Sequence, residues 1–228
     1  MINQKKNINS FVKRSGRLTN AQKKILNSKN NNNNFFLGEK NLNFKELFNN
    51  NNKCILDIGF GDGKLLVSTA KKFPEINFIG IEVYDSGIGN ILKQISEEKL
   101  ENIKVSNTDA IIFLESYVEN NCLHGITLFF PDPWPKKKHF KRRLINVNFF
   151  NKISNFLKKN GTIHIASDSK LYISDILFSF YQVKKEFKWV NQNKNEWDYI
   201  NMTLPQTKYF QKALKRGLNP IYLKLIKY

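Results

Sequence analysis

Short apolar runs alternate with helical segments along the chain from Cys54 to its end. The first five apolar runs begin at Cys54, Asn77, Ile103, Gly125 and Gly161. Apolar residues recur at helical spacing over 65–73, 87–100, 111–119, 144–159 and 171–185. Further strand-like runs at 187–190 and 221–226 bring the expected strands to seven. Because helices that join parallel strands make right-handed crossovers, this order predicts an α/β fold with a mostly parallel sheet and helices on both faces.

Residues 1–52 have a different composition from the rest of the chain. The runs Asn30–Asn34 and Asn49–Asn52 are low-complexity polar tracts, which bury little apolar surface. We expect them to be loops or linkers around a short helix near 44–48. The segment that begins at Ser10 is basic and has few apolar residues, so we expect it to be mobile. The 228 residues therefore divide into a basic, Asn-rich, partly mobile arm (1–52) and one domain (53–228).

The sequence has no feature typical of an exported or membrane protein. Its two cysteines, Cys54 and Cys122, are too few and too far apart for a disulfide framework or a cysteine-based zinc site. No apolar run approaches the ~18 residues that span a bilayer. The first residues lack the apolar stretch of a signal peptide. We expect a cytoplasmic protein that needs no metal ion, since no cluster of ligand residues has metal-site spacing.

The net charge of +18 favours a polyanionic partner. A codon bias that enriches Asn, Ile and Lys could raise the number of scattered lysines without any function. That bias does not explain clustering. Residues 136–143 contain six basic and no acidic residues, and residues 205–228 contain another six basic and no acidic residues. The positions of the charges therefore indicate a binding surface more strongly than their total does.

Acidic side chains follow three successive expected strands. The first strand leads into the sequence Asp57-Ile-Gly-Phe-Gly-Asp-Gly, in which Gly59 and Gly61 allow a tight turn and a close approach of a ligand. Glu82 ends the second strand, where a carboxylate can accept hydrogen bonds from both ribose hydroxyls of a nucleoside. Asp109 follows the third strand and can meet an adenine amino group. In an open α/β sheet, these positions border the ligand crevice.

The charge of this crevice narrows the choice of ligand. An acid-lined crevice is unfavourable for a pyrophosphate, which prefers cations and bare amides. It suits S-adenosylmethionine, a nucleoside that carries an ammonium group and a sulfonium and has no phosphate. The pattern therefore predicts a Rossmann-like, class I methyltransferase that depends on S-adenosylmethionine.

A second group of residues follows the fourth expected strand, in the sequence Phe129-Phe-Pro-Asp-Pro-Trp-Pro-Lys-Lys-Lys-His-Phe-Lys-Arg-Arg. Asp132 lies between two prolines, which restrict the backbone on both sides. Trp134 can stack on a base or form a wall beside it. The basic run that follows can bind phosphates. A rigid acid, an aromatic ring and a cation cluster at one strand end indicate a catalytic site more than a solvated loop.

Five stretches of the sequence resemble the bacterial tRNA (guanine-N7-)-methyltransferases. They are Gly16-Arg-Leu-Thr, Asp57-Ile-Gly-Phe-Gly, Gly80-Ile-Glu-Val, Phe130-Pro-Asp-Pro-Trp-Pro-Lys-Lys with His139-Phe-Lys-Arg-Arg-Leu, and Thr207-Lys-Tyr. The Pro-Asp-Pro-Trp-Pro-Lys-Lys stretch is highly specific. The resemblance implies methylation of N7 of the guanosine at position 46, in the tRNA variable loop, with S-adenosylmethionine as methyl donor.

The resemblance also implies roles for individual residues. The cofactor-site positions are Asp57, Gly59, Gly61, Glu82, Asp109 and Asp132. The substrate positions are Lys136, Asp168, Thr207, Lys208, Tyr209 and Phe210. The RNA-contacting positions are Lys138, His139, Phe140, Lys141, Arg142 and Arg143. Asp132 also falls on the catalytic position.

The chain departs from the family pattern at two of these positions. The family usually has Glu at the position of Asp57, so this carboxylate reaches one methylene less far. The family has Glu where this chain has Phe210, which can contribute only through its backbone or through packing. We expect a monomer that acts on tRNA without an obligate protein partner.

Methyl transfer to guanine N7 needs no general base, because neutral N7 already has a lone pair. We assign to Asp132 the stabilisation of positive charge that develops on the purine, and acceptance of hydrogen bonds from guanine. His164 is expected to pack in a strand. Two alternatives remain open from the residues: a methyltransferase that acts on another RNA or on a protein, and a basic RNA-binding protein without catalysis.

Overall fold

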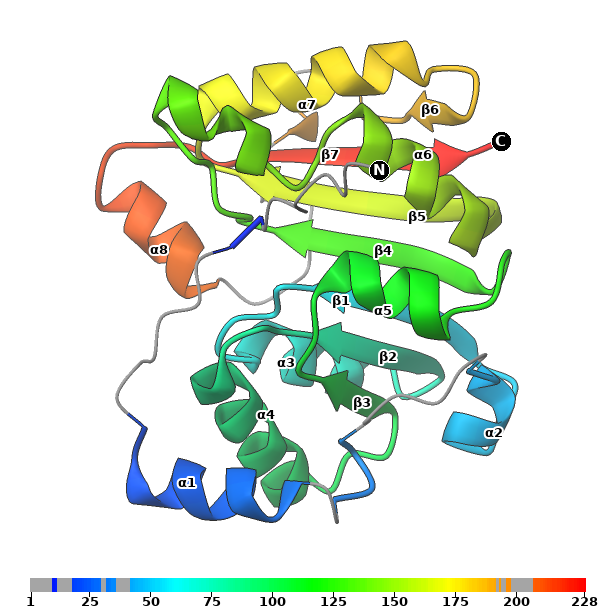
Figure 1. Cartoon of the computed structure of the whole chain (residues 1–228), viewed down its shortest axis with the longest axis vertical. Coiled ribbons are helices and arrows are strands. Elements are labelled where there is room, and N and C mark those ends of the chain that lie inside the picture. The colour runs from blue at the N-terminus through cyan, green and yellow to red at the C-terminus, as the bar shows by residue number, and fades with distance from the viewer. Residues whose placement is uncertain are drawn as a thin grey trace, which may run out of the picture.

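The computed structural model describes residues 10–11, 18–29, 32–35, 42–191, 193, 196–197 and 207–228. Its centre is a seven-stranded sheet in the order β3-β2-β1-β4-β5-β7-β6 (Figure 1). The strands are β1 (Lys53–Ile58), β2 (Ile76–Ile81), β3 (Ile103–Ser106), β4 (Leu123–Phe129), β5 (Leu157–Ser167), β6 (Phe187–Trp189) and β7 (Ile221–Lys227). All neighbours are parallel except β7, which runs antiparallel to both β5 and β6. The predicted mostly parallel seven-stranded sheet is confirmed.

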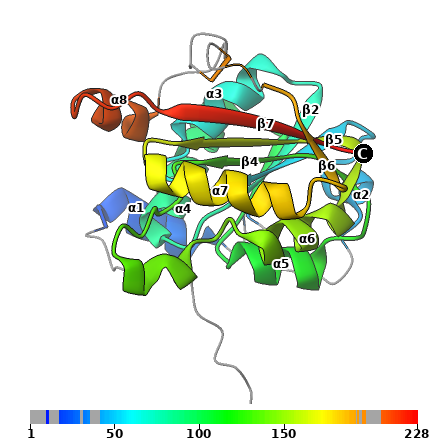
Figure 2. The same ribbon diagram turned by 90° about the horizontal axis from the view of Figure 1, so that it is seen from above.

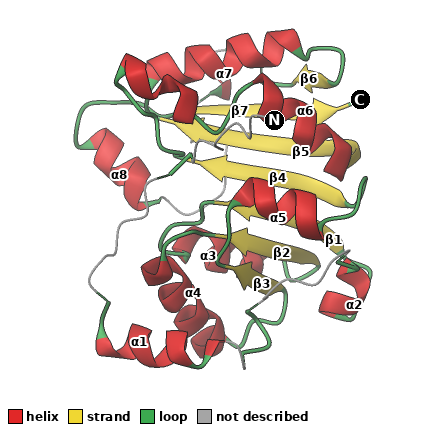
Figure 3. Cartoon of the chain, in the orientation of Figure 1, coloured by secondary structure: helices red, strands yellow, loops and turns green. Residues whose placement is uncertain are grey.

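Helices cover both faces of this sheet (Figure 3). They are α1 (Asn20–Asn27), α2 (Phe44–Phe48), α3 (Lys64–Lys72), α4 (Asp85–Glu98), α5 (Ala110–Tyr117), α6 (Val147–Phe156), α7 (Lys170–Gln182) and α8 (Lys208–Leu214), with a 3-10 helix at Lys137–Arg142. From above, α3 lies on one side of the sheet and α5, α6 and α7 on the other (Figure 2). In the described part of the chain, no helix is long and apolar enough to cross a membrane.

Alternation of side chains along the strands produces the two larger of the three apolar clusters among the described residues. In β1, Cys54, Leu56 and Ile58 pack with α5, α6 and α7, whereas Ile55 contacts the other core. That second core contains residues of α3, α4 and β3, and Ile25 and Leu26 of α1 pack against it. Successive side chains of a strand point to opposite faces, so a strand buried on both sides reads as a continuous apolar run. This is why the parallel strands were recognisable in the sequence.

The helix expected at 144–159 is shorter than predicted. It begins after Asn146, whose side-chain oxygen accepts a hydrogen bond from the Phe149 N–H (3.0 Å). It ends at Phe156, because Leu157 turns to an extended conformation, is fully buried and pairs with Leu123 of β4. Strand β5 therefore starts four residues earlier than the glycine at 161 suggested.

The described residues of the N-terminal segment make specific contacts with the domain. Thr19 and Gln22 form a capping box that starts α1, and Gln22 Nε2 donates to the Ser86 carbonyl of α4 (3.3 Å). Asn34, in a tract that we expected to be a loop, donates from its side chain to two carbonyls beside β3, those of Leu100 (3.2 Å) and Ile103 (2.9 Å). Gly16 and Arg17 of the family-like stretch lie outside the described residues, as do Asn30 and Asn31.

The second asparagine tract is also a specific structure. Asn49 adopts a left-handed conformation that ends α2, the helix predicted near 44–48. The Asn50 side chain accepts hydrogen bonds from Asn77 Nδ2 (2.7 Å) and the Asn52 N–H (3.0 Å), and donates to the Phe48 carbonyl (3.0 Å). Asn77 is fully buried in β2. Paired side-chain amides, and not apolar burial, order this tract.

We expect Asn50→Ala to lower the free energy of unfolding by about 1–3 kcal/mol, because the buried Asn77 amide loses its partner. Asn51→Ala is the matched control, since the neighbouring Asn51 is exposed. Chemical denaturation followed by circular dichroism measures both variants. Equal stabilities of the two would show that the Asn50–Asn77 pair does not hold the tract in place.

Candidate active site

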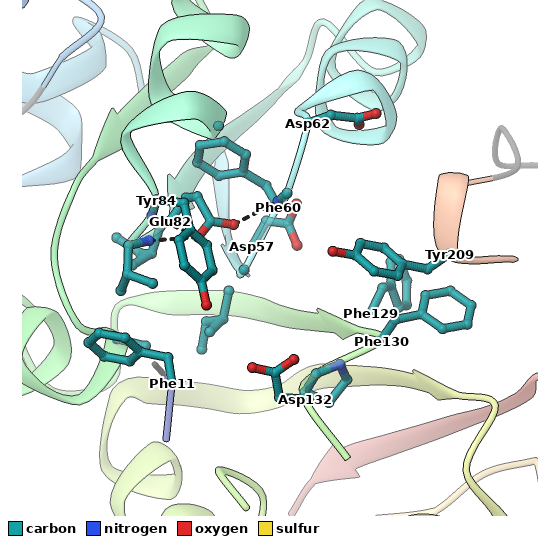
Figure 4. Close-up of a pocket in the computed structure, with 18 of the residues that line it drawn as sticks. Phe11, Asp57, Phe60, Asp62, Glu82, Tyr84, Phe129, Phe130, Asp132 and Tyr209 are labelled. Atoms are coloured by element: carbon teal, nitrogen blue, oxygen red, sulfur yellow. Dashed lines mark hydrogen bonds between the residues drawn. The ribbon is translucent and has the colours of Figure 1, made fainter. Parts of the chain in front are cut away.

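A cavity of about 500 Å³ lies at the carboxyl ends of β1, β2 and β4. Its walls come from the loops after these strands and after β3, from the start of α8, and from Ser10 and Phe11 of the N-terminal segment. Figure 4 shows the carboxylate of Asp132 and the hydroxyl groups of Tyr84 and Tyr209 pointing into it. The tertiary structure thus brings together residues from eight separate stretches of the chain, since Gln22 and Leu144 also line the cavity. Of the predicted site residues, those that line it are Asp57, Gly59, Gly61, Glu82, Asp109, Asp132, Thr207, Lys208 and Tyr209.

The loop after β1 depends on glycine for its backbone conformation. Gly59 and Gly61 have φ values of +76° and +64°, which side-chain-bearing residues rarely adopt. The loop also lies against α4, where a Cβ on Gly87 would sit 2.5 Å from the Gly61 carbonyl oxygen. The bare backbone of Gly59 and Gly61 therefore forms part of the cavity wall, as the sequence predicted.

Glu82 holds this loop to the end of β2. Its carboxylate accepts hydrogen bonds from the N–H groups of Gly61 (2.9 Å), Val83 (2.7 Å) and Tyr84 (3.1 Å). Only 5% of the residue is exposed. Burial raises the pKa of Glu82, while the three amides act in the opposite direction by stabilising its charged form. Glu82 is therefore both a loop anchor and a carboxylate at the cavity.

Asp57 lies beside Glu82 at the end of β1 and is also buried. Its Oδ1 accepts a hydrogen bond from the Thr127 hydroxyl of β4 (2.7 Å). Burial raises the pKa of Asp57 to about 6, against the lowering effect of the Thr127 hydrogen bond, and the nearby charge of Glu82 adds to the increase.

Asp109 has a structural role in addition to the ligand contact that the sequence predicted. Its Oδ1 accepts hydrogen bonds from the N–H groups of Ile111 (2.9 Å) and Ile112 (3.1 Å), so it caps the N-terminus of α5. The cap fixes this side chain at the cavity wall. Among the described residues, no group of three or more His, Cys, Asp or Glu side chains could hold a metal ion.

The loop after β4 holds Asp132 in a strained backbone. Phe130 and Trp134 have φ values of +56° and +43°, unusual for large side chains. Each non-glycine residue in this region costs about 1–3 kcal/mol, and such residues concentrate at functional sites. The two prolines that predicted a rigid Asp132 are therefore themselves enclosed by two residues in the left-handed region.

Helix α8 closes the cavity on another side. The Thr207 hydroxyl accepts from the Phe210 N–H (3.0 Å) and starts the helix. Tyr209 stacks on Phe130 with ring centroids 6.2 Å apart and an interplanar angle of 21°. Burial and the nearby charges of Asp132, Glu82 and Asp62 raise the pKa of the Tyr209 hydroxyl. Phe210 is buried against Ala166 and Tyr222, in agreement with the expectation that it acts through packing.

The basic segment after Asp132 divides into exposed and buried parts. Lys138 and Lys141 are exposed, Arg142 is partly exposed, and the Arg142 guanidinium lies 5.0 Å from the centre of the Trp134 ring. Arg143, predicted to contact RNA, is instead 4% exposed. It forms an ion pair with Asp175 and donates from Nε to the Pro133 carbonyl (2.8 Å). The charge of Arg143 is therefore used inside the protein in this structure, and its RNA contact stays a prediction.

Several other predicted residues lie away from the cavity lining. Trp134, which we expected beside a base, donates from Nε1 to the Ser10 carbonyl (2.9 Å), and its ring meets His139 edge-on with centroids 5.5 Å apart. Lys136 precedes the 3-10 helix and is exposed, and Asp168 follows β5. Neither residue lines the cavity, and neither does Phe140, which lies under the Arg143 guanidinium at 3.7 Å. His164 lies in β5, as expected.

The sequence reading missed several cavity residues. Tyr84 follows Glu82 by two residues, so its position after the second strand could have identified it. Thr127 does not line the cavity but holds Asp57 at its wall, and only the register of β1 with β4 places the two residues opposite each other. Ser10 and Phe11 carry no signal in the sequence, since nothing local indicates that they reach the cavity.

Solved structures with a similar fold are methyltransferases. An antibiotic-related methyltransferase superposes with a TM-score of 0.53 at 17% identity, covering 84% of this chain and 96% of its own. The aminoglycoside resistance methyltransferase NpmB1 gives 0.52 at 11% identity, covering 81% and 92%. The fold is that of the class I S-adenosylmethionine-dependent methyltransferases.

Sequence relatives are more specific. Residues 51–223 match a family described as "Putative methyltransferase". A tRNA (guanine-N(7)-)-methyltransferase of Nitrosococcus oceani is 40% identical over 92% of this chain and 86% of its own, and one of Francisella philomiragia is 37% identical over 93% and 90%. The chain belongs to the tRNA (guanine-N7)-methyltransferase family.

The two neighbouring arginines provide a matched pair. We expect Arg143→Ala to lower the free energy of unfolding by about 1–3 kcal/mol, because it leaves the Pro133 carbonyl and Asp175 without their partner. Arg142→Ala removes the same charge from a partly exposed position and is expected to change stability by less than about 0.5 kcal/mol. Thermal unfolding measures both. If the two variants unfold at the same temperature, the Arg143 contacts do not support the loop.

Asp57→Asn tests the raised pKa of Asp57. The free carboxyl has a pKa near ~3.9, so between about pH 4 and 6 the folded state binds the proton more tightly than the unfolded state, and the contribution of Asp57 to stability decreases as pH rises. We expect Asp57→Asn to be more stable than the parent by about 2–3 kcal/mol at pH 7 and by little at pH 4. Denaturant titrations from pH 4 to 8 measure the difference, and Glu75→Gln, on an exposed turn, controls for loss of one negative charge. A difference independent of pH would show that the Asp57 pKa is ordinary.

Proposed function

We propose that the protein transfers a methyl group from S-adenosylmethionine to N7 of the guanine at position 46 of tRNA. The observation that carries the proposal is Asp132, an exposed carboxylate in a strained loop that points into a cavity lined by the two buried carboxylates of Asp57 and Glu82. The names of the relatives support tRNA and guanine N7. Position 46 rests on the resemblance of the motifs to those of the bacterial family.

The residues at the cavity fit S-adenosylmethionine. The bare backbone of Gly59 and Gly61 leaves room for a ligand, and the buried carboxylates of Asp57 and Glu82 suit a ligand without phosphate. Glu82 would hold its ribose, Asp109 its adenine and Asp57 its ammonium group, with Tyr84 as an aromatic wall. When bound, S-adenosylmethionine supplies an electrophilic methyl group on a positive sulfur.

The protein's own contribution is alignment, charge stabilisation and exclusion of water. Asp132 lines the cavity together with Tyr209 and Glu82, and its charge contributes to raising the pKa of both. Its carboxylate would accept hydrogen bonds from guanine and stabilise the positive charge that the purine gains. Stacked Phe130 and Tyr209, together with Phe11, would exclude water from the reacting atoms.

The remaining assignments are part of this proposal. Lys136, Asp168 and the stretch Thr207–Phe210 would bind the substrate nucleoside, and Lys138, Lys141 and Arg142 would contact tRNA phosphates next to it. Residues 53–228 would be the catalytic domain and 1–52 an arm. The enzyme would act in the cytoplasm as a monomer.

The decisive experiment is nucleoside analysis by mass spectrometry after incubation of a tRNA with S-adenosylmethionine carrying a labelled methyl group. We expect labelled 7-methylguanosine, and none from the same tRNA with A46. Label in another nucleoside, in both tRNAs or in none would contradict the proposal.

Asp132→Asn should separate binding from chemistry. We expect the methyl-transfer rate to fall by about 10²-fold or more, the scale for loss of a preorganised electrostatic group. Affinities for tRNA and S-adenosylhomocysteine should stay within roughly tenfold of the parent, because the substitution keeps the shape of the side chain. Single-turnover kinetics at saturating substrates isolates the chemical step. Asp85→Asn, exposed at the start of α4, is the matched control. Equal rates for the two variants would make Asp132 a structural turn residue.

A further inference from the structure

We propose that the outward face of α8 is a second tRNA-binding surface, separate from the basic segment that follows Asp132. The proposal rests on the proposed function, because it takes tRNA as the partner. It assigns this role to Lys212, Lys215 and Arg216, which are not among the substrate positions that the family motifs indicate.

Helix α8 has one apolar and one basic side. Phe210 and Ala213 are buried, at 6% and 0% exposure, on the side that faces the sheet. The exposed cations follow Lys208 at spacings of four, seven and eight residues, which a helix with 3.6 residues per turn places on one side. They are Lys208, Lys212, Lys215 and Arg216. The helical path extends past Leu214, since the Lys215 N–H bonds to the Gln211 carbonyl (3.1 Å).

No acid neutralises this surface within the described residues. Residues 207–228 contain six basic and no acidic residues. In the parts of the chain that the structure covers, no ion pair involves any of the four cations of α8. Like charges on a short helix repel one another. Lys212 lies 5.6 Å from the centre of the Tyr209 ring, a contact that does not cancel its charge. A polyanionic partner provides the compensation that the fold lacks.

The position of α8 identifies that partner. Stacking of Tyr209 on Phe130 joins the helix to the strand end that leads into Asp132. Both basic segments lie at the carboxyl edge of the sheet, where the cavity opens (Figure 1). Seen from above, α8 and the green 3-10 helix at Lys137–Arg142 lie on opposite sides of the sheet (Figure 2). A folded RNA that inserts one base between them presents phosphates to both.

The test compares two variants that each lose three positive charges. One is Lys212→Gln/Lys215→Gln/Arg216→Gln on α8, and the other is Lys158→Gln/Lys159→Gln/Lys185→Gln at exposed positions near the opposite ends of the strands. Binding of unmodified tRNA is measured by fluorescence anisotropy from 50 to 300 mM KCl. Each lost phosphate contact lowers the slope of log affinity against log salt by roughly 0.7–0.9.

We expect the α8 variant to bind tRNA at least tenfold more weakly than the parent at low salt, with a slope reduced by about 2. The control variant should keep the parental slope. Calorimetric affinity for S-adenosylhomocysteine should be the same in all three proteins, which shows that α8 and the cavity are intact. An unchanged slope in the α8 variant, or an equal reduction in both variants, would overturn the proposal.

The same binding measurement separates this inference from the proposed function. The measurement needs no methyl transfer. If the parent protein binds tRNA through α8 but forms no 7-methylguanosine, the α8 proposal is supported and the proposed activity is contradicted. If the parent protein methylates G46 and the α8 variant binds tRNA as tightly as the parent, the proposed activity is supported and the α8 proposal is contradicted.

Discussion

The structure of the site depends on the carboxylate of Glu82. By accepting three backbone N–H groups, it ties the glycine loop after β1 to the end of β2. A buried carboxylate is costly unless hydrogen bonds compensate for lost water, and here the amides of the loop provide that compensation. Asp57 beside it is buried as well, and burial raises the cost of its charge, which the hydrogen bond from Thr127 only partly offsets. The cavity is therefore maintained at the expense of stability, in a form that favours a positive, phosphate-free ligand.

The loop that carries Asp132 is held in place by contacts with residues outside it. Two large residues with positive φ would relax if the chain were free. Arg143 opposes this by binding the Pro133 carbonyl, and its guanidinium lies between Phe140 and Tyr172 at 3.7 and 5.1 Å. On the other side, Phe130 meets Tyr209 of α8. The strain is localised where a carboxylate must keep its direction.

In this protein, negative charges at the site are buried and positive charges near it are exposed. The carboxylates of Asp57 and Glu82 are buried beside the cavity, whereas the cations of α8 are exposed at the same edge of the sheet (Figure 1). Such a division allows one edge of the sheet to hold two ligands of opposite character. A cationic nucleoside fits inside, and a polyanion fits outside, where exposed lysines keep their hydration until phosphates replace it. An even distribution of the same charges would serve neither ligand.

The sequence by itself determined the alternation of strands and helices along the chain, the glycine loop and the acids at the strand ends. These features depend on local periodicity and on the residues that terminate strands. Local sequence also singled out Asp132 between its two prolines, and motif resemblance added the Thr207 stretch. The tertiary structure alone decided which partner each side chain takes. Arg143 and Lys141 are two residues apart in one basic run, yet one is buried on Asp175 and the other is exposed. Asn34 and Asn50 lie in tracts typical of loops, yet carbonyls beside β3 and the Asn77 amide of β2 order them. Composition cannot anticipate these pairs, since each joins residues distant in sequence through a register that only the assembled sheet defines.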